Sequence, residues 1–138
     1  MTHPIDPTQQ KIIGEINALG SLKEIYSYLI TLGKAHEVNT TDLHRDEFRI
    51  PGCLSDAWLK VTLEEDRLHF ELDHESVIMQ GLLVLVLRSY NHKPAKYIAK
   101  TPLTFLEETG LMKQFSQSKS NGLIRVIDHM RETANQHL

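Results

Sequence analysis

The alternation of apolar and polar residues is clearest in the middle of the chain. Apolar side chains occupy every second position over residues 59–63 and again over residues 68–72, and the acidic link 64–66 joins the two runs. A period of two gives each strand one buried face, so the pattern predicts an antiparallel hairpin. Because the link contains no glycine, its turn type stays open.

Helical periodicity flanks the hairpin. Before it, apolar residues recur at helical spacing in two segments, the first ending at Gly20 and the second near Gly33. After it, we expect a helix over residues 75–90 with Asp73 as its N-cap. The middle of that helix, residues 82–87, is apolar on every face, which predicts a central helix that is covered on most sides.

Capping signals divide the C-terminal part of the chain. Thr101 and Pro102 form an N-cap followed by a first-turn proline, and Gly110 closes the helix that they open. A last helix starts at Ser118 or Ser120 and carries an apolar face. Two helices are therefore predicted after the central one.

The segments before the hairpin complete the predicted architecture. Residues 35–46 are polar and should form a surface connection, and residues 48–50 a short strand. We expect the hairpin to pack on helix 75–90, with Gly81 permitting close approach. Helices on both sides of an antiparallel hairpin predict an α+β fold, in which a small antiparallel sheet of about three strands packs against several helices.

Composition and charge narrow the classes of function. The 138 residues suit a single domain over residues 1–138, with residues 1–7 as a flexible N-terminus. The net charge is −3 and there is no Lys/Arg block, so a nucleic-acid partner has no electrostatic support. The N-terminus lacks the basic start and apolar stretch of a secretory signal, and the longest apolar run is too short to span a bilayer. Together with a single cysteine, this predicts a cytoplasmic location.

Cys53 is the only cysteine of the chain, so it cannot form an intramolecular disulfide or supply a zinc cage. Pro51 and Gly52 break regular structure just before it, which predicts that its sulfur lies on a turn. A free cysteine is either a small buried hydrophobe or a soft nucleophile, and the residues alone leave both interpretations open.

The remaining polar residues give weaker signals. The eight histidines are scattered, and no pair has the i, i+4 spacing beside a carboxylate that would predict a metal site. His44 is the histidine nearest in sequence for a Cys–His pair. Trp58 is expected to anchor the core, and Asp56 to be a turn or surface carboxylate rather than a base. No phosphate loop or dinucleotide fingerprint occurs.

Residues 51–58, Pro-Gly-Cys-Leu-Ser-Asp-Ala-Trp, resemble the sulfur-acceptor motif of the SufE family. That motif reads Gly-Cys, one variable residue, Ser, two variable residues, Trp. Three further segments resemble the family in the same order: residues 25–33, the Gly-Leu pair at 81–82, and Ser-Lys-Ser-Asn-Gly at 118–122. The chain departs from the common pattern at four positions, which are Phe48, Leu54, Ala57 and Lys119.

The resemblance implies a SufE/IscU-like fold and a persulfide relay. Cys53 would take sulfur from a cysteine desulfurase of the SufS or CsdA kind, stimulate it, and pass the sulfur to a downstream scaffold for iron–sulfur cluster assembly. The pyridoxal phosphate (PLP) of this reaction belongs to the desulfurase, so the chain itself needs no cofactor or metal. Neither a nucleic acid nor a membrane is an expected partner.

The desulfurase is expected to dock on one face, formed by the cysteine turn, residues 118–122 and the connection 35–46. The residues expected there are Gly52, Leu54, Ser55, Asp56, Lys119 and Asn121. Two other classes stay open. One is a stand-alone cysteine-dependent thiol enzyme of the peroxidase type. The other is a cluster scaffold or interaction module, although a scaffold would need about three or four ligands.

Overall fold

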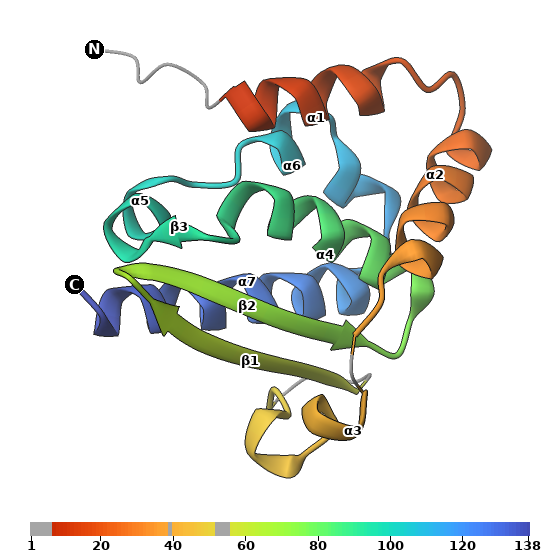
Figure 1. The fold of residues 1–138 in the computed structure, drawn as a ribbon. Helices are drawn as coiled ribbons and strands as arrows, with labels where there is room; N and C mark the ends of the chain where they lie inside the picture. The colour runs from red at the N-terminus through yellow and green to blue at the C-terminus, as the bar shows by residue number, and fades with distance from the viewer. Residues whose placement is uncertain (1–6, 39, 52–55) are drawn as a thin grey trace.

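The computed structural model describes residues 7–38, 40–51 and 56–138 of the chain (Figure 1). Over this part, helices surround a three-stranded antiparallel sheet of order β1-β2-β3, which confirms the predicted α+β class. The strands are β1 Ala57–Glu64, β2 Arg67–His74 and β3 Lys93–Pro94. The helices are α1 Pro7–Asn17, α2 Leu22–Ala35, α3 Thr40–Leu43, α4 Val77–Tyr90, α5 Ala95–Lys100, α6 Phe105–Glu108 and α7 Gln117–Gln136, with short 3-10 helices η1 Asp46–Phe48 and η2 Leu111–Gln114.

The predicted hairpin is formed by β1 and β2. Its register pairs Leu59 with Leu72 and Leu63 with Leu68 across the ladder. Glu65 and Asp66 make the turn with φ values of 48° and 67°. Positive φ at both central residues is the mark of a type I′ turn, whose twist matches that of the flanking strands. The turn therefore forms without the glycine that usually signals it.

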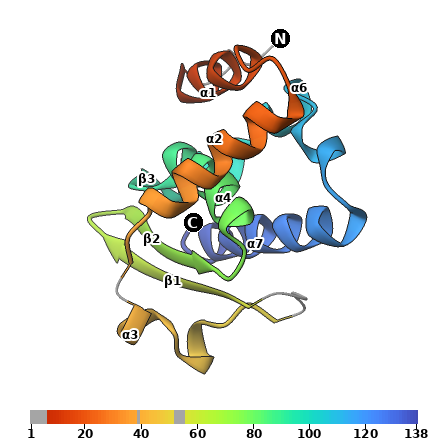
Figure 2. The same ribbon diagram turned by 90° about the vertical axis from the view of Figure 1, so that its right-hand side faces the viewer.

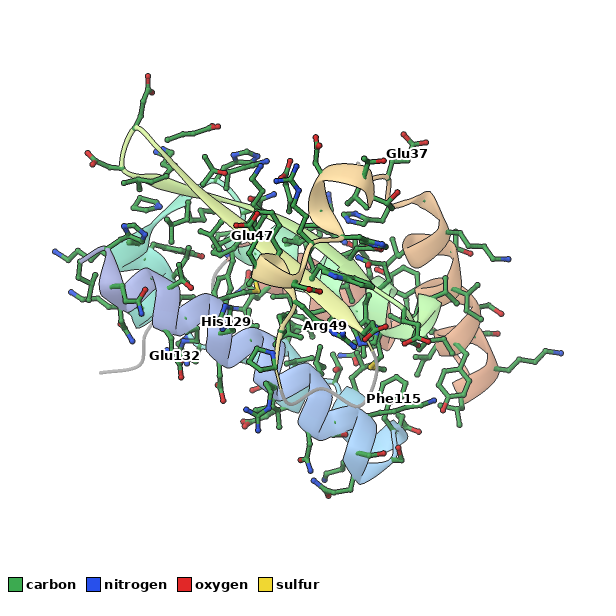
Figure 3. All side chains as sticks on the ribbon, turned by 90° about the horizontal axis from the view of Figure 1, so that it is seen from below. Glu37, Glu47, Arg49, Phe115, His129 and Glu132 are labelled. Carbon is green, nitrogen blue, oxygen red and sulfur yellow. The ribbon has the colours of Figure 1, made fainter. Side chains whose placement is uncertain are left out.

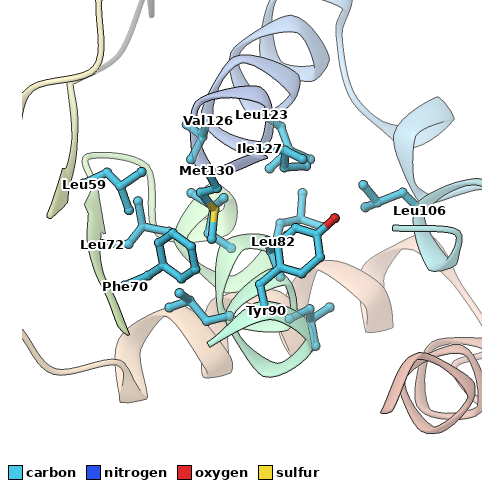
Figure 4. Packing of buried hydrophobic residues seen from close by; sticks show 14 of the residues in the cluster. Leu59, Phe70, Leu72, Leu82, Tyr90, Leu106, Leu123, Val126, Ile127 and Met130 are labelled. Atoms are coloured by element: carbon cyan, nitrogen blue, oxygen red, sulfur yellow. The ribbon is translucent and has the colours of Figure 1, made fainter. Parts of the chain in front are cut away.

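The core lies between the sheet, α4 and α7. Figure 4 shows Leu72 and Phe70 of β2 beside Leu82 of α4 and Met130 of α7. The middle of α4 is almost completely buried, as predicted for a central helix. The predicted cap of this helix is wrong: Ser76, not Asp73, accepts the Met79 N–H at 3.4 Å and starts the helix.

A backbone contact joins α2 to α4. A Cβ atom added to Gly81 would lie 2.0 Å from the carbonyl oxygen of Leu29, and one added to Gly33 would lie 2.1 Å from that of Val77. Both glycines thus let the two helices approach through their main chains. The expectation that Gly81 faces the hairpin is wrong, because the main chain of α2 fills the space beside it.

Several shorter elements differ from the sequence prediction. β3 and α5 were not predicted; β3 adds to the sheet by pairing Lys93 with Leu68. The helix expected from Thr101 begins only at Phe105, and Gly110, with a φ of 68°, follows its end as predicted. The last helix starts after Ser116, whose hydroxyl caps α7.

The connection between α2 and β1 lies below β1 in both Figure 1 and Figure 2, whereas α1 and α2 lie above it. It contains α3 and η1, so it is less irregular than its polar sequence indicates. Across the described residues, none of the helices combines the length and the apolar character needed to cross a membrane.

The contact between α2 and α4 leads to a matched pair of glycine substitutions. Gly81→Ala should lower the free energy of unfolding by about 3 kcal/mol, because a methyl group there overlaps the main chain of α2. Gly14 is an exposed residue of α1, and a Cβ atom added there would meet nothing within 4 Å. Gly14→Ala should therefore raise the free energy of unfolding by up to about 1 kcal/mol through helix propensity. Urea unfolding measures both. A Gly81→Ala protein as stable as the parent would contradict the contact.

Candidate functional site

The flanks of the cysteine segment come together at the start of β1. Gly52, Cys53, Leu54 and Ser55 lie outside the described residues, so the site is described from its two ends. Arg49 forms a single antiparallel bridge with Trp58. Beside it, the Ile50 N–H donates to the Ala57 carbonyl oxygen at 2.9 Å. The strand expected at residues 48–50 is thus reduced to this bridge, which closes residues 51–56 into a loop.

Asp56 is tied to its surroundings on three sides. Its backbone N–H donates to the Glu75 carboxylate at 2.9 Å, and its carbonyl oxygen accepts the Glu75 N–H at 2.9 Å. Its side chain accepts a hydrogen bond from the Arg49 guanidinium, which also forms an ion pair with it. Its carboxylate therefore joins the two flanks of the loop. This fits the expected turn carboxylate and not a free base.

The outer face of β1 is covered by α3. The His44 ring stacks on the Trp58 indole with ring centroids 3.7 Å apart, and its Nε2 atom pairs with the Asp73 carboxylate. Trp58 is only half-buried and packs on this outer face, so its expected role as a core anchor is wrong. His44 serves as a link between α3 and both strands of the hairpin.

Behind the base of the loop lie the half-buried His74 and the buried Gln80. The Gln80 side-chain oxygen accepts the His74 N–H at 2.7 Å, and the His74 ring Nδ1 accepts the Ser76 N–H at 2.9 Å. Burial lowers the pKa of His74, and the nearby Glu75 carboxylate partly opposes this effect. The Gln80 amide nitrogen is buried and has no hydrogen-bond acceptor within the described part of the chain.

A cleft of about 600 Å³ separates the base of the loop from α7. Ile50 and Pro51 line one side of the cleft. α7 forms the other side, where Ser118 and Asn121 lie near the start of the helix. Further along α7, the wall of the cleft carries basic and acidic side chains, which are Arg125, Asp128, His129 and Glu132. Figure 3 views this face and labels Arg49, which precedes the loop, and His129 and Glu132 on α7. The cleft offers a polar surface next to the loop.

The structure brings together some of the residues expected at the docking face. Ser118 and Asn121 share the cleft with Pro51, and the connection 35–46 reaches the loop base through His44. Lys119 is exposed on the first turn of α7 and is not among the residues that line the cleft. Residues 49 and 75 had no signal in the sequence, since their partners are set only by the register of the sheet.

Comparison with known proteins identifies the family. The family model described as "SufE: Fe-S metabolism associated domain" matches residues 10–134. The chain belongs to the SufE family. An uncharacterized SufE-like protein of Rhizobium etli is 32% identical over 129 residues, covering 90% of this chain and 87% of that protein.

Another SufE relative carries a more specific description. The sulfur acceptor protein CsdE of Escherichia coli is 37% identical over 100 residues, covering 71% of this chain and 68% of CsdE. The fold has a counterpart in the solution structure of a hypothetical protein from Thermus thermophilus, with a TM-score of 0.77 over 97% of this chain and 98% of that one. At 10% identity, this likeness concerns the fold alone.

The lowered pKa of His74 predicts how stability near the loop depends on pH. A histidine whose folded pKa lies below its unfolded value, near 6.5, contributes stability that is present above that value and is lost as the pH falls through the folded pKa. His74→Asn keeps an acceptor for the Ser76 N–H but cannot titrate. Relative to this variant, the parent should lose unfolding free energy between about pH 7.5 and about pH 5, as measured by chemical denaturation. An equal difference at both pH values would contradict the assignment.

Proposed function

We propose that the protein is a sulfur acceptor, which takes persulfide sulfur from a PLP-dependent cysteine desulfurase onto Cys53 and delivers it for iron–sulfur cluster assembly. The observation that carries the proposal is the similarity to CsdE, which is described as a sulfur acceptor protein. Cys53 is the sole cysteine of the chain, so it is the one thiol that can hold the sulfur.

The proposed transfer is a thiol exchange between two proteins. The Cys53 thiolate attacks the outer sulfur of a persulfide on the desulfurase, a new S–S bond forms on Cys53, and the desulfurase cysteine leaves as a thiolate. One S–S bond forms and one breaks, so no external oxidant or reductant is needed. A single cysteine suits a carrier, because a second thiol nearby could expel the sulfur as sulfide by forming a disulfide.

The arrangement around the loop supports this role in two ways. Hydrogen bonds of Ile50 and Asp56 anchor the chain on both sides of the cysteine segment, so both ends of that segment are fixed to the sheet and its neighbours. Sulfur transfer requires the two sulfur atoms to meet, so the desulfurase must contact the surface around Cys53. The cleft beside the loop is part of that surface. The proposed docking residues are Gly52, Leu54, Ser55, Asp56, Lys119 and Asn121.

The first test concerns the thiol itself. With a SufS- or CsdA-like desulfurase, cysteine and PLP, mass spectrometry should detect the mass of one added sulfur atom on the peptide containing Cys53. Cys53→Ser should abolish this addition and the stimulation of desulfurase turnover, while circular dichroism stays unchanged. If Cys53→Ser still stimulates the desulfurase as the parent does, the relay is wrong. Turnover of a peroxide with a thiol reductant and no desulfurase would favour the peroxidase-type enzyme instead.

The second test concerns docking through Lys119. Lys119→Glu should slow association with the desulfurase, and more so at low salt, because exposed charges act mainly on the encounter rate. The same substitution places Glu three residues after the N-cap Ser116, a capping-box arrangement that should not destabilise α7. Stopped-flow measurement across a salt series shows whether the association rate changes, and a change that is larger at low salt identifies an effect of charge on encounter rather than a loss of helix stability.

Lys96→Glu serves as the matched control for that experiment. Lys96 is also exposed, but it lies on α5, at the opposite end of the molecule from the start of α7 (Figure 1). Its reversal changes the net charge by the same amount, so it should leave the association rate nearly unchanged. Equal slowing by both variants would attribute the effect to net charge and remove Lys119 from the docking face.

A further inference from the structure

Two histidines meet at the end of the hairpin that is remote from the cysteine loop. His69 Nδ1 and His92 Nε2 lie 3.3 Å apart, and the ring centroids lie 4.6 Å apart with a tilt of 32°. The two residues are separated by 23 positions in the sequence, so their spacing along the chain predicts no pair. Only the return of the chain from α4 to the sheet brings them together.

Both rings are held by structured backbone. His69 lies within β2, opposite Thr62 of β1. The His92 N–H donates to the Leu68 carbonyl oxygen at 2.9 Å, and the His92 carbonyl oxygen accepts from the Arg67 guanidinium at 2.9 Å. His92 also has a φ of 62°, a left-handed conformation that is uncommon outside glycine. The main chain is therefore fixed on both sides of the ring pair.

The separation of the two nitrogen atoms suits a shared metal ion. Two imidazole nitrogens bound to one zinc ion at tetrahedral angles lie about 3.3 Å apart, given Zn–N bonds of about 2.0–2.1 Å. In the hydrogen bond between the two rings, one nitrogen donates its proton to the other. A change of tautomer in the donor ring and a modest rotation about the soft terminal torsions of both side chains would point both lone pairs at one ion.

The surroundings of the pair are open and mainly acidic. A cleft of about 480 Å³ is lined by the two histidines together with Glu64, Glu65 and Arg67. The guanidinium of Arg67 is engaged by the His92 carbonyl oxygen, and the two carboxylates provide negative charge at the rim. Within the described ranges, no three His, Cys, Asp or Glu side chains form a metal-binding group, so water would complete the coordination.

We propose that His69 and His92 form a surface site for a divalent first-row transition-metal ion with a preference for imidazole, such as Zn²⁺. Ions that prefer oxygen ligands, such as Mg²⁺, should not compete. The site lies at the hairpin tip, and β1 separates it by roughly 20 Å from the loop base at Ala57. It is therefore independent of sulfur transfer through Cys53.

Isothermal titration with Zn²⁺ at about pH 7.5, where imidazole is mostly neutral, tests the site. The titration uses the full chain in a Cys53→Ser background, which removes the thiol as a competing ligand. His69→Gln and His92→Asn each leave one imidazole, and loss of the chelate should weaken Zn²⁺ binding by about a hundredfold. Asn is chosen at residue 92 because it tolerates positive φ. NMR of the parent should show the His69 and His92 ring signals shifting first as Zn²⁺ is added.

His129→Gln is the matched control, since His129 is exposed on α7 and belongs to the other cleft. It should bind Zn²⁺ like the parent, and Mg²⁺ in excess should not displace the ion. Circular dichroism checks that each variant is folded; if one is not, the ring shifts of the parent decide. Binding unaffected by both His69→Gln and His92→Asn, or no shift of either ring, would overturn the proposal.

Discussion

The main-chain contact between α2 and α4 is the constraint on which the rest of the structure depends. Gly81 and Gly33 remove the side chains that would keep these helices apart, so α4 is covered closely on the side of α2. Its other sides can then be covered by the sheet and by α7, which is why its middle is apolar all around. The arrangement of every layer follows from the position of this one helix.

The same helix also positions the candidate site. Glu75 lies in the short link between β2 and α4, and it holds Asp56 through both its main chain and its carboxylate. Gln80, in the first turns of α4, bonds the His74 N–H at the end of β2. One end of the loop that contains Cys53 is thus attached to the link that leads directly into the most buried helix of the fold.

Elements that depend on residues close together in the sequence could be predicted, whereas contacts between distant segments could not. The hairpin follows from a period of two, and the central helix follows from its unbroken apolar run, so both were predicted from the sequence. The two-residue turn at Glu65 and Asp66 could not be, because it lacks glycine and Glu65 is an unusual choice for positive φ. The neighbour of Gly81 was mistaken because a helix that is apolar on every side gives no sign of which element covers which face. The candidate site divides in the same way. Cys53 and residues 118–122 were proposed from their resemblance to a family motif, whereas the links of Arg49, Glu75 and His44 join separate segments whose pairing depends on the register of the sheet.

The closed base of the cysteine loop limits how far the Cys53 thiol can extend from the rest of the protein. With Ile50 bonded to Ala57, residues 51–56 are the whole tether available to the thiol. A chain extends at most about 3.6 Å per residue and must return to its base, so Cys53 can stand only roughly 10 Å above it. A protein that hands over sulfur must bring its own sulfur within that short distance, and a donor buried at the end of a long narrow channel would be out of reach unless the base opens.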